Sequence, residues 1–375
     1  MSTPTVLPAA PLGQPDPQVP VTLAWYGCDL RTGAIIEDLR TLKPGGALGR
    51  KLGETTTLSA NLGLAGAPAD WEAATAPGTA LLVAVDTATD TPVWPGIVLT
   101  RDGGSATDIS LQCATPERYL DARYTGTVTA VQQDQATVLT SLFSNAMSDG
   151  PPFVLDAPPT GRPLDYSVLD GDDRTILSAV QEIMGMEGGP EWTVDVAWNA
   201  DHSGFVLPVR VRPAIGTQAV QPEGVFDYPG CVSSYTLAES YESGKGATVV
   251  QARGEGESAG RLTSQVYTAD ALIAGGWPRW VHRFTPASGL TDPVQLNAHA
   301  ARALALMQTG AKVWSVEAVA SVAPRIGRDW GLGDSVRIAV ESSPRHPRGA
   351  ETVARAWAWE LDPGADRIRP ILVED

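Results

Sequence analysis

The alternation of hydrophobic and polar residues near the C-terminus predicts an antiparallel β-hairpin. Val336, Ile338 and Val340 alternate with polar or small residues, as in a strand that buries one face. Residues 353–361 alternate in the same way, and the polar residues 342–350 form the connecting loop. One face of the second strand is predicted to carry Val353, Arg355, Trp357 and Trp359, with alanines and a glutamate on the other face.

A glycine turn leads into this hairpin. Gly331 and Gly333 both permit a positive φ angle, and Asp334 stands at the exit of the turn. Together with Trp330, these residues are predicted to form the structural turn of a C-terminal β unit.

An earlier part of the chain has the same order of parts, and this order predicts two copies of one small β unit. In each copy a strand is followed by a tryptophan, a glycine turn and a hairpin. The N-terminal copy consists of residues 57–62, Trp71, the turn at Pro77 and Gly78, and strands at 81–85 and 93–99. The C-terminal copy consists of residues 314–319, Trp330, the turn at 331–333 and the hairpin described above.

Between the two β units the hydrophobic period changes to that of helices. Asp134 is a predicted N-cap of one helix, and Asp172 and Asp173 are predicted to cap a second. Asp292 followed by Pro293 starts a third. We therefore expect an α+β, mainly β fold with a flexible Pro-rich arm at 1–20, a first β-barrel domain at 21–125, an α/β module of two helices and a hairpin at 126–220, and a second β-barrel domain at 221–375 with a helix at 292–309 and the C-terminal hairpin.

The composition supports a turn-rich globular protein and argues against nucleic-acid binding. The chain has 43% hydrophobic and 19% charged residues, with 38 glycines and 30 prolines. This content favours many short strands over long helices. The net charge of −16 produces a surface that repels phosphate groups.

The cysteines and the termini indicate neither a disulfide scaffold nor a secreted or membrane protein. Cys28, Cys113 and Cys231 are far apart and form no CxxC pair, so we expect buried free thiols in a reducing compartment. Residues 1–20 contain six prolines and lack the pattern of a signal peptide. No apolar run approaches membrane-spanning length, so stable membrane insertion is not expected.

The sequence carries no recognisable catalytic, cofactor or metal motif, so we expect a protein that is not an enzyme. His299 is predicted to lie on the exposed side of its helix, and His202 and His346 are predicted to face solvent. HExxH, GxSxG, P-loop and dinucleotide-binding motifs are all absent. Three neighbouring carboxylate pairs have the residue types for acid/base work but are expected by chance among 43 acidic residues: Glu239 with Glu242, Glu255 with Glu257, and Asp172 with Asp173.

Eleven tryptophans are more than usual for this length, and most of them are expected to fill the core. Tryptophans on the surface would suit a sugar-binding platform or a protein interface. Trp277 and Trp280, in a loop-like context, are the best candidates for such an interface.

The order of several short motifs resembles the baseplate hub, or tail-associated minor tail, proteins of long-tailed bacteriophages, especially phages of actinobacteria. The resemblance extends over nearly the full length from Val21, and its specificity lies in the order and spacing of the motifs. These motifs are residues 28–39 followed by 48–54, Pro77 and Gly78 with residues 94–96, residues 119–123, and residues 329–336.

This resemblance implies two tail-tube-like β-barrel domains and a homotrimer whose six barrels continue the hexameric tail tube. The implied partners are a distal tail protein ring, the tape measure protein, and fibre, spike or receptor-binding proteins. DNA would pass through the lumen without specific binding, and an acidic lumen would keep phosphates from adhering. The implied location is the virion tail tip or baseplate, after assembly in the bacterial cytoplasm.

Three questions stay open at the level of sequence. The hub of a contractile injection machine has the same implied architecture as a phage tail hub. A carbohydrate- or receptor-binding tail component that uses exposed tryptophans is an alternative, and a peptidoglycan hydrolase is a third. Related hubs often carry a C-terminal hydrolase or fibre-binding extension, whereas this sequence stops at Asp375, so wall digestion and receptor binding are expected from separate chains.

Overall fold

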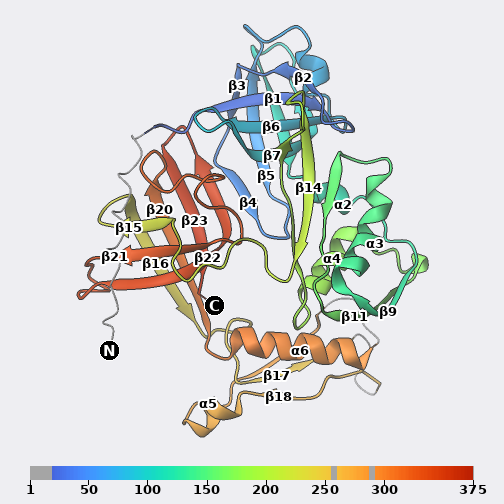
Figure 1. Ribbon diagram of the computed structural model, residues 1–375, viewed down its shortest axis with the longest axis vertical. Coiled ribbons are helices and arrows are strands. Elements are labelled where there is room, and N and C mark those ends of the chain that lie inside the picture. Colours follow the sequence, from blue (N-terminus) through green and yellow to red (C-terminus); the bar gives the residue numbers. More distant parts are fainter. Residues whose placement is uncertain (1–18, 255–259, 287–291, 375) are drawn as a thin grey trace, which may run out of the picture.

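A computed structural model describes residues 19–254, 260–286 and 292–374, and its fold is mainly β (Figure 1). The first β unit is a seven-stranded sheet with the strand order β2-β1-β6-β7-β8-β5-β3. None of the helices in these ranges combines the length and apolar character needed to cross a lipid bilayer. The strands of the first sheet are β1 (Leu23–Asp29), β2 (Ile35–Asp38), β3 (Leu42–Pro44), β5 (Thr57–Gly63), β6 (Ala80–Asp86), β7 (Thr91–Asp102) and β8 (Asp108–Ala114), and the short helices α1 (Trp71–Ala74) and α2 (Glu117–Leu120) accompany them.

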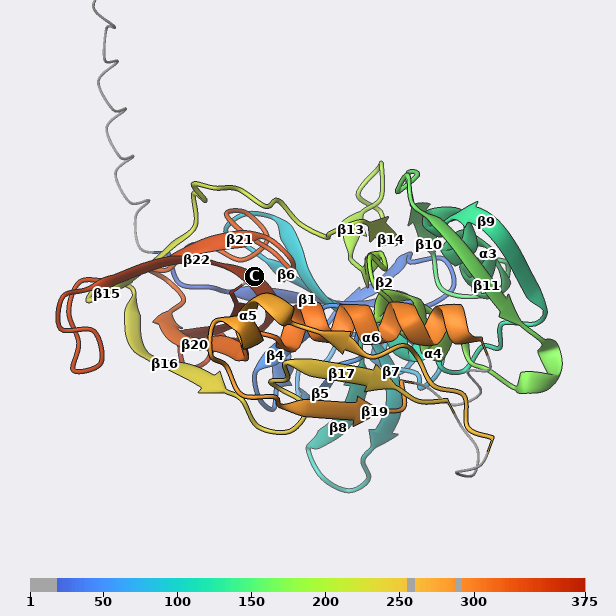
Figure 2. The same cartoon turned by 90° about the horizontal axis from the view of Figure 1, so that it is seen from below.

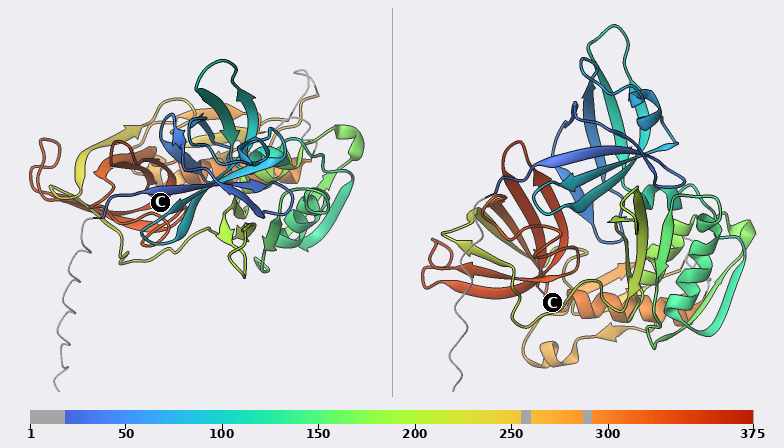
Figure 3. Two further views of the ribbon diagram at one scale, coloured as in Figure 1. Left: turned by 90° about the horizontal axis from the view of Figure 1, so that it is seen from above. Right: turned by 45° about the horizontal axis from the view of Figure 1, so that its top comes forward.

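The second β unit contains a sheet with the order β15-β21-β22-β23-β20-β16, to which a strand of the N-terminal region also pairs. This sheet lies beside the first one in Figures 1 and 3. Its strands are β15 (Val225–Tyr228), β16 (Val232–Ser240), β20 (Ala311–Val319), β21 (Ser335–Val340), β22 (Ala350–Asp362) and β23 (Arg367–Val373).

The strand order confirms the predicted repeat. The run β6-β7-β8-β5 in the first sheet has the same connectivity as the run β21-β22-β23-β20 in the second. In each run three strands follow one another as hairpins, and the strand that precedes them in sequence pairs antiparallel with the last. The tryptophan and glycine turn therefore mark the entry to the same hairpin in both units.

Strand β4 (Leu48–Lys51) joins the two units, a connection that the sequence did not reveal. It follows β3 in the chain but pairs antiparallel with β22 of the second sheet. The indole Nε1 of Trp94 in β7 donates a hydrogen bond of 3.1 Å to the carbonyl of Gly49 in β4. Buried side chains of both sheets consequently form a single hydrophobic cluster.

An irregularity in β22 changes the faces predicted for this strand. Val353 is exposed, whereas Ala354 and Ala356 are buried. The register of β22 against β23 shifts between Ala356 and Ala358, and after this shift Trp359 is buried. A β-bulge of this kind reverses which alternate residues face the core. The prediction of one face shared by residues 353 to 359 was therefore wrong.

The α/β module has its own hydrophobic cluster. Asp134 caps α3 as predicted, because its carboxylate accepts a 2.9 Å hydrogen bond from the Ala136 N–H. The predicted cap of α4 was wrong: the N-cap is Thr175, and Asp173 lies two residues earlier with a φ of 49°. The module consists of β9 (Val128–Asp134), α3 (Gln135–Met147), β10 (Phe153–Asp156), β11 (Pro163–Val168), the 3-10 turn Asp170–Asp172, α4 (Ile176–Met184), β12 (Glu191–Val194), β13 (Ala197–Trp198) and β14 (Phe205–Arg212).

A third, smaller layer interrupts the second β unit. Helix α6 runs along a three-stranded sheet of order β18-β17-β19 and forms a separate small core with it (Figure 2). Asp292 caps this helix as predicted, through a 2.9 Å hydrogen bond from the Val294 N–H. The layer consists of β17 (Val249–Ala252), β18 (Tyr267–Thr268), α5 (Asp270–Ala274), β19 (Val281–Phe284) and α6 (Pro293–Met307).

Candidate functional site

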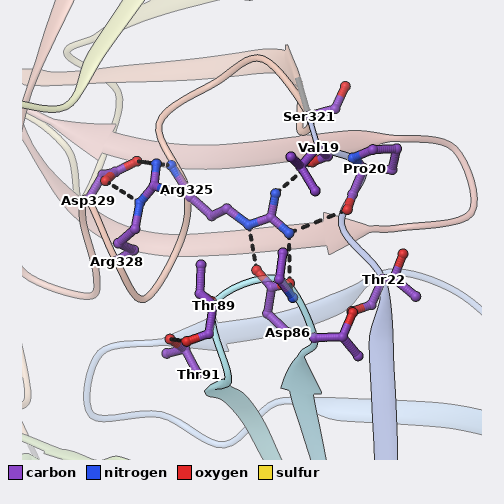
Figure 4. Close-up of polar contacts among 12 residues, drawn as sticks. Val19, Pro20, Thr22, Asp86, Thr89, Thr91, Ser321, Arg325, Arg328 and Asp329 are labelled. Carbon is purple, nitrogen blue, oxygen red and sulfur yellow. Dashed lines mark hydrogen bonds and ion pairs between the residues drawn. The ribbon is translucent and has the colours of Figure 1, made fainter. Parts of the chain in front are cut away.

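The most distinctive chemistry in the described residues is a set of buried arginine–carboxylate pairs that cross from one module to another. The first joins Arg325, in the loop after β20, to Asp86 at the end of β6 (Figure 4). Arg325 Nε lies 2.5 Å from Asp86 Oδ2, and Nη2 lies 2.7 Å from Oδ1. The remaining nitrogen, Nη1, donates to the carbonyl of Val19 at 2.6 Å. This guanidinium therefore holds the two β units and the start of the described chain together.

The second pair joins the α/β module to the second β unit. Arg355 in β22 donates to both oxygens of Glu191 in β12, at 2.9 and 2.7 Å. Its Nε donates to the carbonyl of Gly333 at 3.2 Å, and Glu191 accepts a 2.8 Å bond from the Ile215 N–H. The pair thus fixes the linker after β14 and the glycine turn at the same point.

The third pair joins β4 and α2 to the α/β module. Arg50 in β4 lies 3.3 Å from Glu117 Oε1, and the same nitrogen donates to the carbonyl of Val194 in β12. Glu117 is fully buried, and burial raises the pKa of its carboxyl, an effect that the charge of Arg50 opposes. Removing one member of such a pair leaves an uncompensated buried charge, which costs about 3–5 kcal/mol.

The predicted structural turn lies at the second of these junctions. Asp334 accepts a 2.7 Å hydrogen bond from the Gly331 N–H and a 2.6 Å bond from the Thr217 N–H. The indole of Trp330 is buried and donates to the Pro324 carbonyl at 2.9 Å. Gly333 has a φ of +82°, as predicted. Gly331 is not among the glycines with positive φ, so that part of the prediction was wrong.

The same turn lines an open pocket of about 630 Å³. Arg50, Arg210 and Arg328 also line this pocket, and each of them forms an ion pair with a carboxylate. Arg50 contacts a second module, whereas Arg210 and Arg328 pair with carboxylates of their own modules, and we assign the pocket no separate chemistry.

The structure places the two candidate interface tryptophans on the surface of the small third layer. Trp277 is 40% exposed and Trp280 is 52% exposed. Both rings lean against Tyr241, with centroid distances of 5.6 and 5.8 Å. Val281, the first residue of the edge strand β19, is also exposed. These side chains form an aromatic surface, here defined as Tyr241, Trp277, Trp280 and Val281.

The histidines lie partly where the sequence predicts. His202 is exposed and stacks on Trp198. His346 is only half-buried, and its Nδ1 lies 2.7 Å from the hydroxyl of Tyr235, so its prediction as simply solvent-facing was wrong. His299 was also predicted wrongly: it is 6% exposed. Helix α6 packs against the end of α4 as well as against its own sheet, as the Glu187 N–H to Ala298 carbonyl bond of 3.1 Å shows.

Three of the carboxylates considered for catalysis, Glu239, Glu242 and Asp172, have structural partners. Glu239 binds Arg345 at 2.6 Å, and Glu242 binds Lys245 at 3.1 Å. Asp172 accepts a hydrogen bond from the Leu169 N–H at 2.8 Å. Glu255 and Glu257 lie outside the described residues.

The thiols and possible metal ligands offer no reactive group in the part of the chain that the structure describes. Cys28, Cys113 and Cys231 are buried and free, as predicted, and burial raises the pKa of each thiol to about 12. Thiols with such values remain protonated and unreactive. In the described ranges, no group of three or more His, Cys, Asp or Glu side chains is arranged to hold a metal ion.

Sequence reasoning did not identify the six residues of the inter-module ion pairs. Asp86 and Arg325 are 239 positions apart, and no local pattern links residues so distant. The one available signal was the presence of charged residues inside otherwise apolar strands, as with Arg355 between Ala354 and Ala356. The six residues are Arg50, Asp86, Glu117, Glu191, Arg325 and Arg355.

The fold is shared with a tail protein and a prophage tail protein of known structure. A tail protein from Neisseria meningitidis MC58 superposes with a TM-score of 0.54 at 12% identity, covering 94% of this chain and 97% of that chain. Prophage tail protein gp18 from Listeria monocytogenes EGD-e gives a TM-score of 0.53 at 11% identity, covering 94% of each chain. No protein-family model and no curated protein sequence matches the chain.

A chain of the Francisella PdpA–VgrG complex also shares the fold. It gives a TM-score of 0.55 at 9% identity and covers 94% of this chain. The present chain spans about half of that longer protein, 52% of its length. Identities this low show a common fold, and the similarity extends over both β units and the modules between them.

Proposed function

We propose that this chain is a structural hub of a phage-type tail or baseplate and that it has no enzymatic activity. The observation that carries the proposal is the full-length similarity of its fold to phage tail proteins, together with the repeated strand order in the two β units. The buried ion pairs support a structural role, because they hold the β units and the α/β module as one body.

In this proposal three copies assemble into a ring. Each copy contributes two β units, so the ring contains six, and it continues a hexameric tail tube with a channel for DNA and the tape measure protein. A distal tail protein ring binds on one side, and fibre, spike or receptor-binding proteins bind on the other. The phage of an actinobacterium is the proposed source, and the tail tip of the virion, assembled in the host cytoplasm, is the proposed location.

Negative-stain electron microscopy of the purified chain tests the ring. The proposal predicts particles with three-fold symmetry and a central pore. Compact particles without a pore, at concentrations at which the chain is monodisperse, would contradict it. Zymography of the same sample against bacterial cell walls tests the absence of enzymatic activity, and a clearing zone would support a peptidoglycan hydrolase instead.

One observation favours a second candidate function, the binding of glycan or receptor. The aromatic surface of Tyr241, Trp277, Trp280 and Val281 presents two large indoles to solvent. Exposed aromatic rings stack on sugars and also anchor protein interfaces. Glycan-array binding by the wild-type chain, lost in a Trp277→Ala/Trp280→Ala double variant, would support this candidate, whereas no binding by the wild type would leave the surface to a protein partner.

A further inference from the structure

The aromatic surface of the third layer takes no part in the contacts between modules described above. Trp277 and Trp280 are 40% and 52% exposed, and Val281 beside them is exposed as well. Neither indole N–H has a hydrogen-bond acceptor in the part of the chain that the structure describes. Two exposed indoles with available donors suit a partner that offers apolar side chains together with carbonyl acceptors.

The rings of this surface are held in place by the layer beneath them. The Tyr241 hydroxyl donates to the Gln308 carbonyl at 3.2 Å. Thr248 is buried and fixes the loop that carries the two tryptophans. Its hydroxyl donates to the Pro278 carbonyl at 2.9 Å and accepts from the Trp280 N–H at 2.9 Å. A surface that is ordered in this way loses little conformational freedom when a partner binds.

The Pro-rich arm of the chain has the matching chemistry. Residues 1–15 contain four prolines and no charged side chain, although 19% of the whole chain is charged. Residues 8–11, Pro-Ala-Ala-Pro, form a PxxP motif. Such a motif in the polyproline II conformation presents proline rings and unpaired carbonyls, and aromatic-lined surfaces bind both. The arm is therefore a suitable occupant of the aromatic surface.

The point at which the arm joins the described residues lies far from this surface. Arg325 Nη1 binds the Val19 carbonyl at 2.6 Å, at the junction with the first β unit. Arg325 follows the end of β20, whereas Tyr241 follows Ser240, which pairs with Ala311 at the start of β20. The nine residues of β20 separate the two points by about 30 Å. In Figure 1 the first sheet and the third layer accordingly lie at opposite ends of the molecule.

The motif cannot span this distance within one copy. Pro11 precedes Val19 by eight positions, which extend over about 25 Å in a polyproline II segment. A second PxxP motif, at residues 17–20, is held at the junction itself, where Arg325 Nη2 lies 3.4 Å from the Pro20 carbonyl. A PxxP motif that reaches the aromatic surface must therefore come from another copy of the chain.

We propose that the arm of one copy binds, through residues 8–11, the aromatic surface of a neighbouring copy. One copy supplies the arm and the other supplies the surface, so the contact is head-to-tail. Contacts of this kind close into a ring when the rotation between copies permits it. The inference rests on the proposed trimeric ring, in which each arm would hold the next copy.

The test uses the full-length chain with Gly13→Cys, labelled with bimane, a fluorophore that tryptophan quenches at contact distance. Residue 13 flanks the motif and leaves it intact. The native thiols are expected to stay unlabelled, because each is buried and has a pKa of about 12. Quenching is expected in the assembled protein and is expected to be lost in Trp277→Phe/Trp280→Phe. Trp71→Phe alters a half-buried ring of the first unit and should retain the quenching.

Mixing two chains tests whether the arm acts between copies. The labelled chain that carries Trp277→Phe/Trp280→Phe is combined at low concentration with excess unlabelled wild type, and the mixture is then concentrated. Quenching is expected to return, because the labelled arm finds an intact surface on its neighbour. Quenching that is present in the labelled wild type but does not return in the mixture would overturn the proposal, as would an unquenched wild type or equal brightening by Trp71→Phe.

A variant of the arm provides an independent readout. Pro8→Ala/Pro11→Ala lies outside the folded body and is expected to abolish the quenching, whereas Pro4→Ala/Pro15→Ala keeps the motif and is expected to retain it. Equal quenching in these two variants would contradict the assignment to residues 8–11. Light scattering of the labelled wild type separates the two proposals. A three-chain particle with an unquenched label overturns the arm contact alone, and a single-chain particle overturns the ring as well.

Discussion

The first and second β units share one arrangement of four strands but differ in what surrounds it. In the first unit, β1 lies antiparallel beside β6, and β3 lies beside β5. In the second unit, β15 lies parallel beside β21, and β16 lies beside β20. In each run three of the four shared strands follow one another as hairpins, and the fourth, β5 or β20, precedes them in the chain. The common part of the repeat is therefore the run of four strands, and the copies differ in the strands that flank it.

The long-range contacts also show how the two copies are joined. Strand β4 follows β3 of the first unit in the chain but pairs with β22 of the second unit. Arg325 of the second unit binds Asp86 of the first unit, at the end of β6. We therefore expect the protein to lose much of its stability when one of these two contacts between the units is removed.

Loss of the Asp86–Arg325 pair is the largest effect we predict, because it affects both units at once. Arg325→Ala leaves the buried Asp86 carboxylate without its partner, and the side chains are only 7% and 1% exposed. The expected loss in the free energy of unfolding is about 3–5 kcal/mol. Chemical denaturation followed by tryptophan fluorescence measures it.

An exposed ion pair provides the control for this variant. Arg40 binds Asp38 at 2.8 Å, but its side chain is 83% exposed. Arg40→Ala is expected to change the unfolding midpoint very little, since exposed pairs contribute little to stability. If both variants destabilised the protein equally, the junction would have no special part in holding the two units together.

The glycine turns distinguish the two units further. Gly333 has a φ of +82°, and a Cβ at this position would lie 2.2 Å from the carbonyl oxygen of Ile215. Gly78, in the turn of the first unit, has a φ of +74° but no atom within 4 Å of its Cβ position. We expect Gly333→Ala to cost about 2–5 kcal/mol through backbone strain and a clash, and Gly78→Ala about 1–2 kcal/mol through strain alone.

Thermal and chemical denaturation of both variants test this difference. Gly331→Ala is the matched control within the same turn, because its nearest neighbour would be Asp334 Oδ2 at 3.5 Å and its φ is not positive. It is expected to change stability by less than about 1 kcal/mol. Equal losses for Gly78→Ala and Gly333→Ala would show that the second turn is not held against the linker at Ile215.

A smaller effect is predicted for the Arg50–Glu117 pair, in the pH dependence of stability. Burial raises the pKa of Glu117 above its ordinary value of 4.5. A carboxyl whose folded-state pKa is raised contributes stability that is present below its unfolded pKa and is lost as pH rises through the folded pKa. Relative to Glu117→Gln, the wild type is therefore expected to be more stable at about pH 4 than at about pH 7.

Denaturation curves of the two proteins across this pH range provide the measurement. The difference between their free energies of unfolding should change steadily as pH rises above about 4.5. Parallel curves would mean that Glu117 titrates as it does in the unfolded chain, and that Arg50 offsets the whole cost of its burial.

Local signals in the sequence were sufficient for most of the fold. Alternating residues predicted the strand at 336–340, the repeated order of parts predicted the strands at 57–62 and 81–85, and the caps Asp134 and Asp292 located the starts of α3 and α6. The order of turn and tryptophan predicted the repeat. These features depend on residues within a few positions of each other, and for this reason a single sequence reveals them.

The features that were predicted wrongly or missed depend instead on contacts between residues far apart in the chain. The bulge in β22 depends on pairing with β23, and the burial of His299 depends on contact between α6 and α4. The pairing of β4 with β22 spans some three hundred positions of the chain. Sequence periodicity describes one face of an isolated element, so it does not report a second contact or a partner from another module.

The solution mass of the purified chain, measured by light scattering over a range of concentrations, tests the central claim most directly. Three chains of 39.4 kDa give a trimer of about 118 kDa, and the account predicts this mass with six β units in one particle. A monodisperse species of 39.4 kDa at the highest concentration would contradict the homotrimeric hub and favour a monomeric binding module.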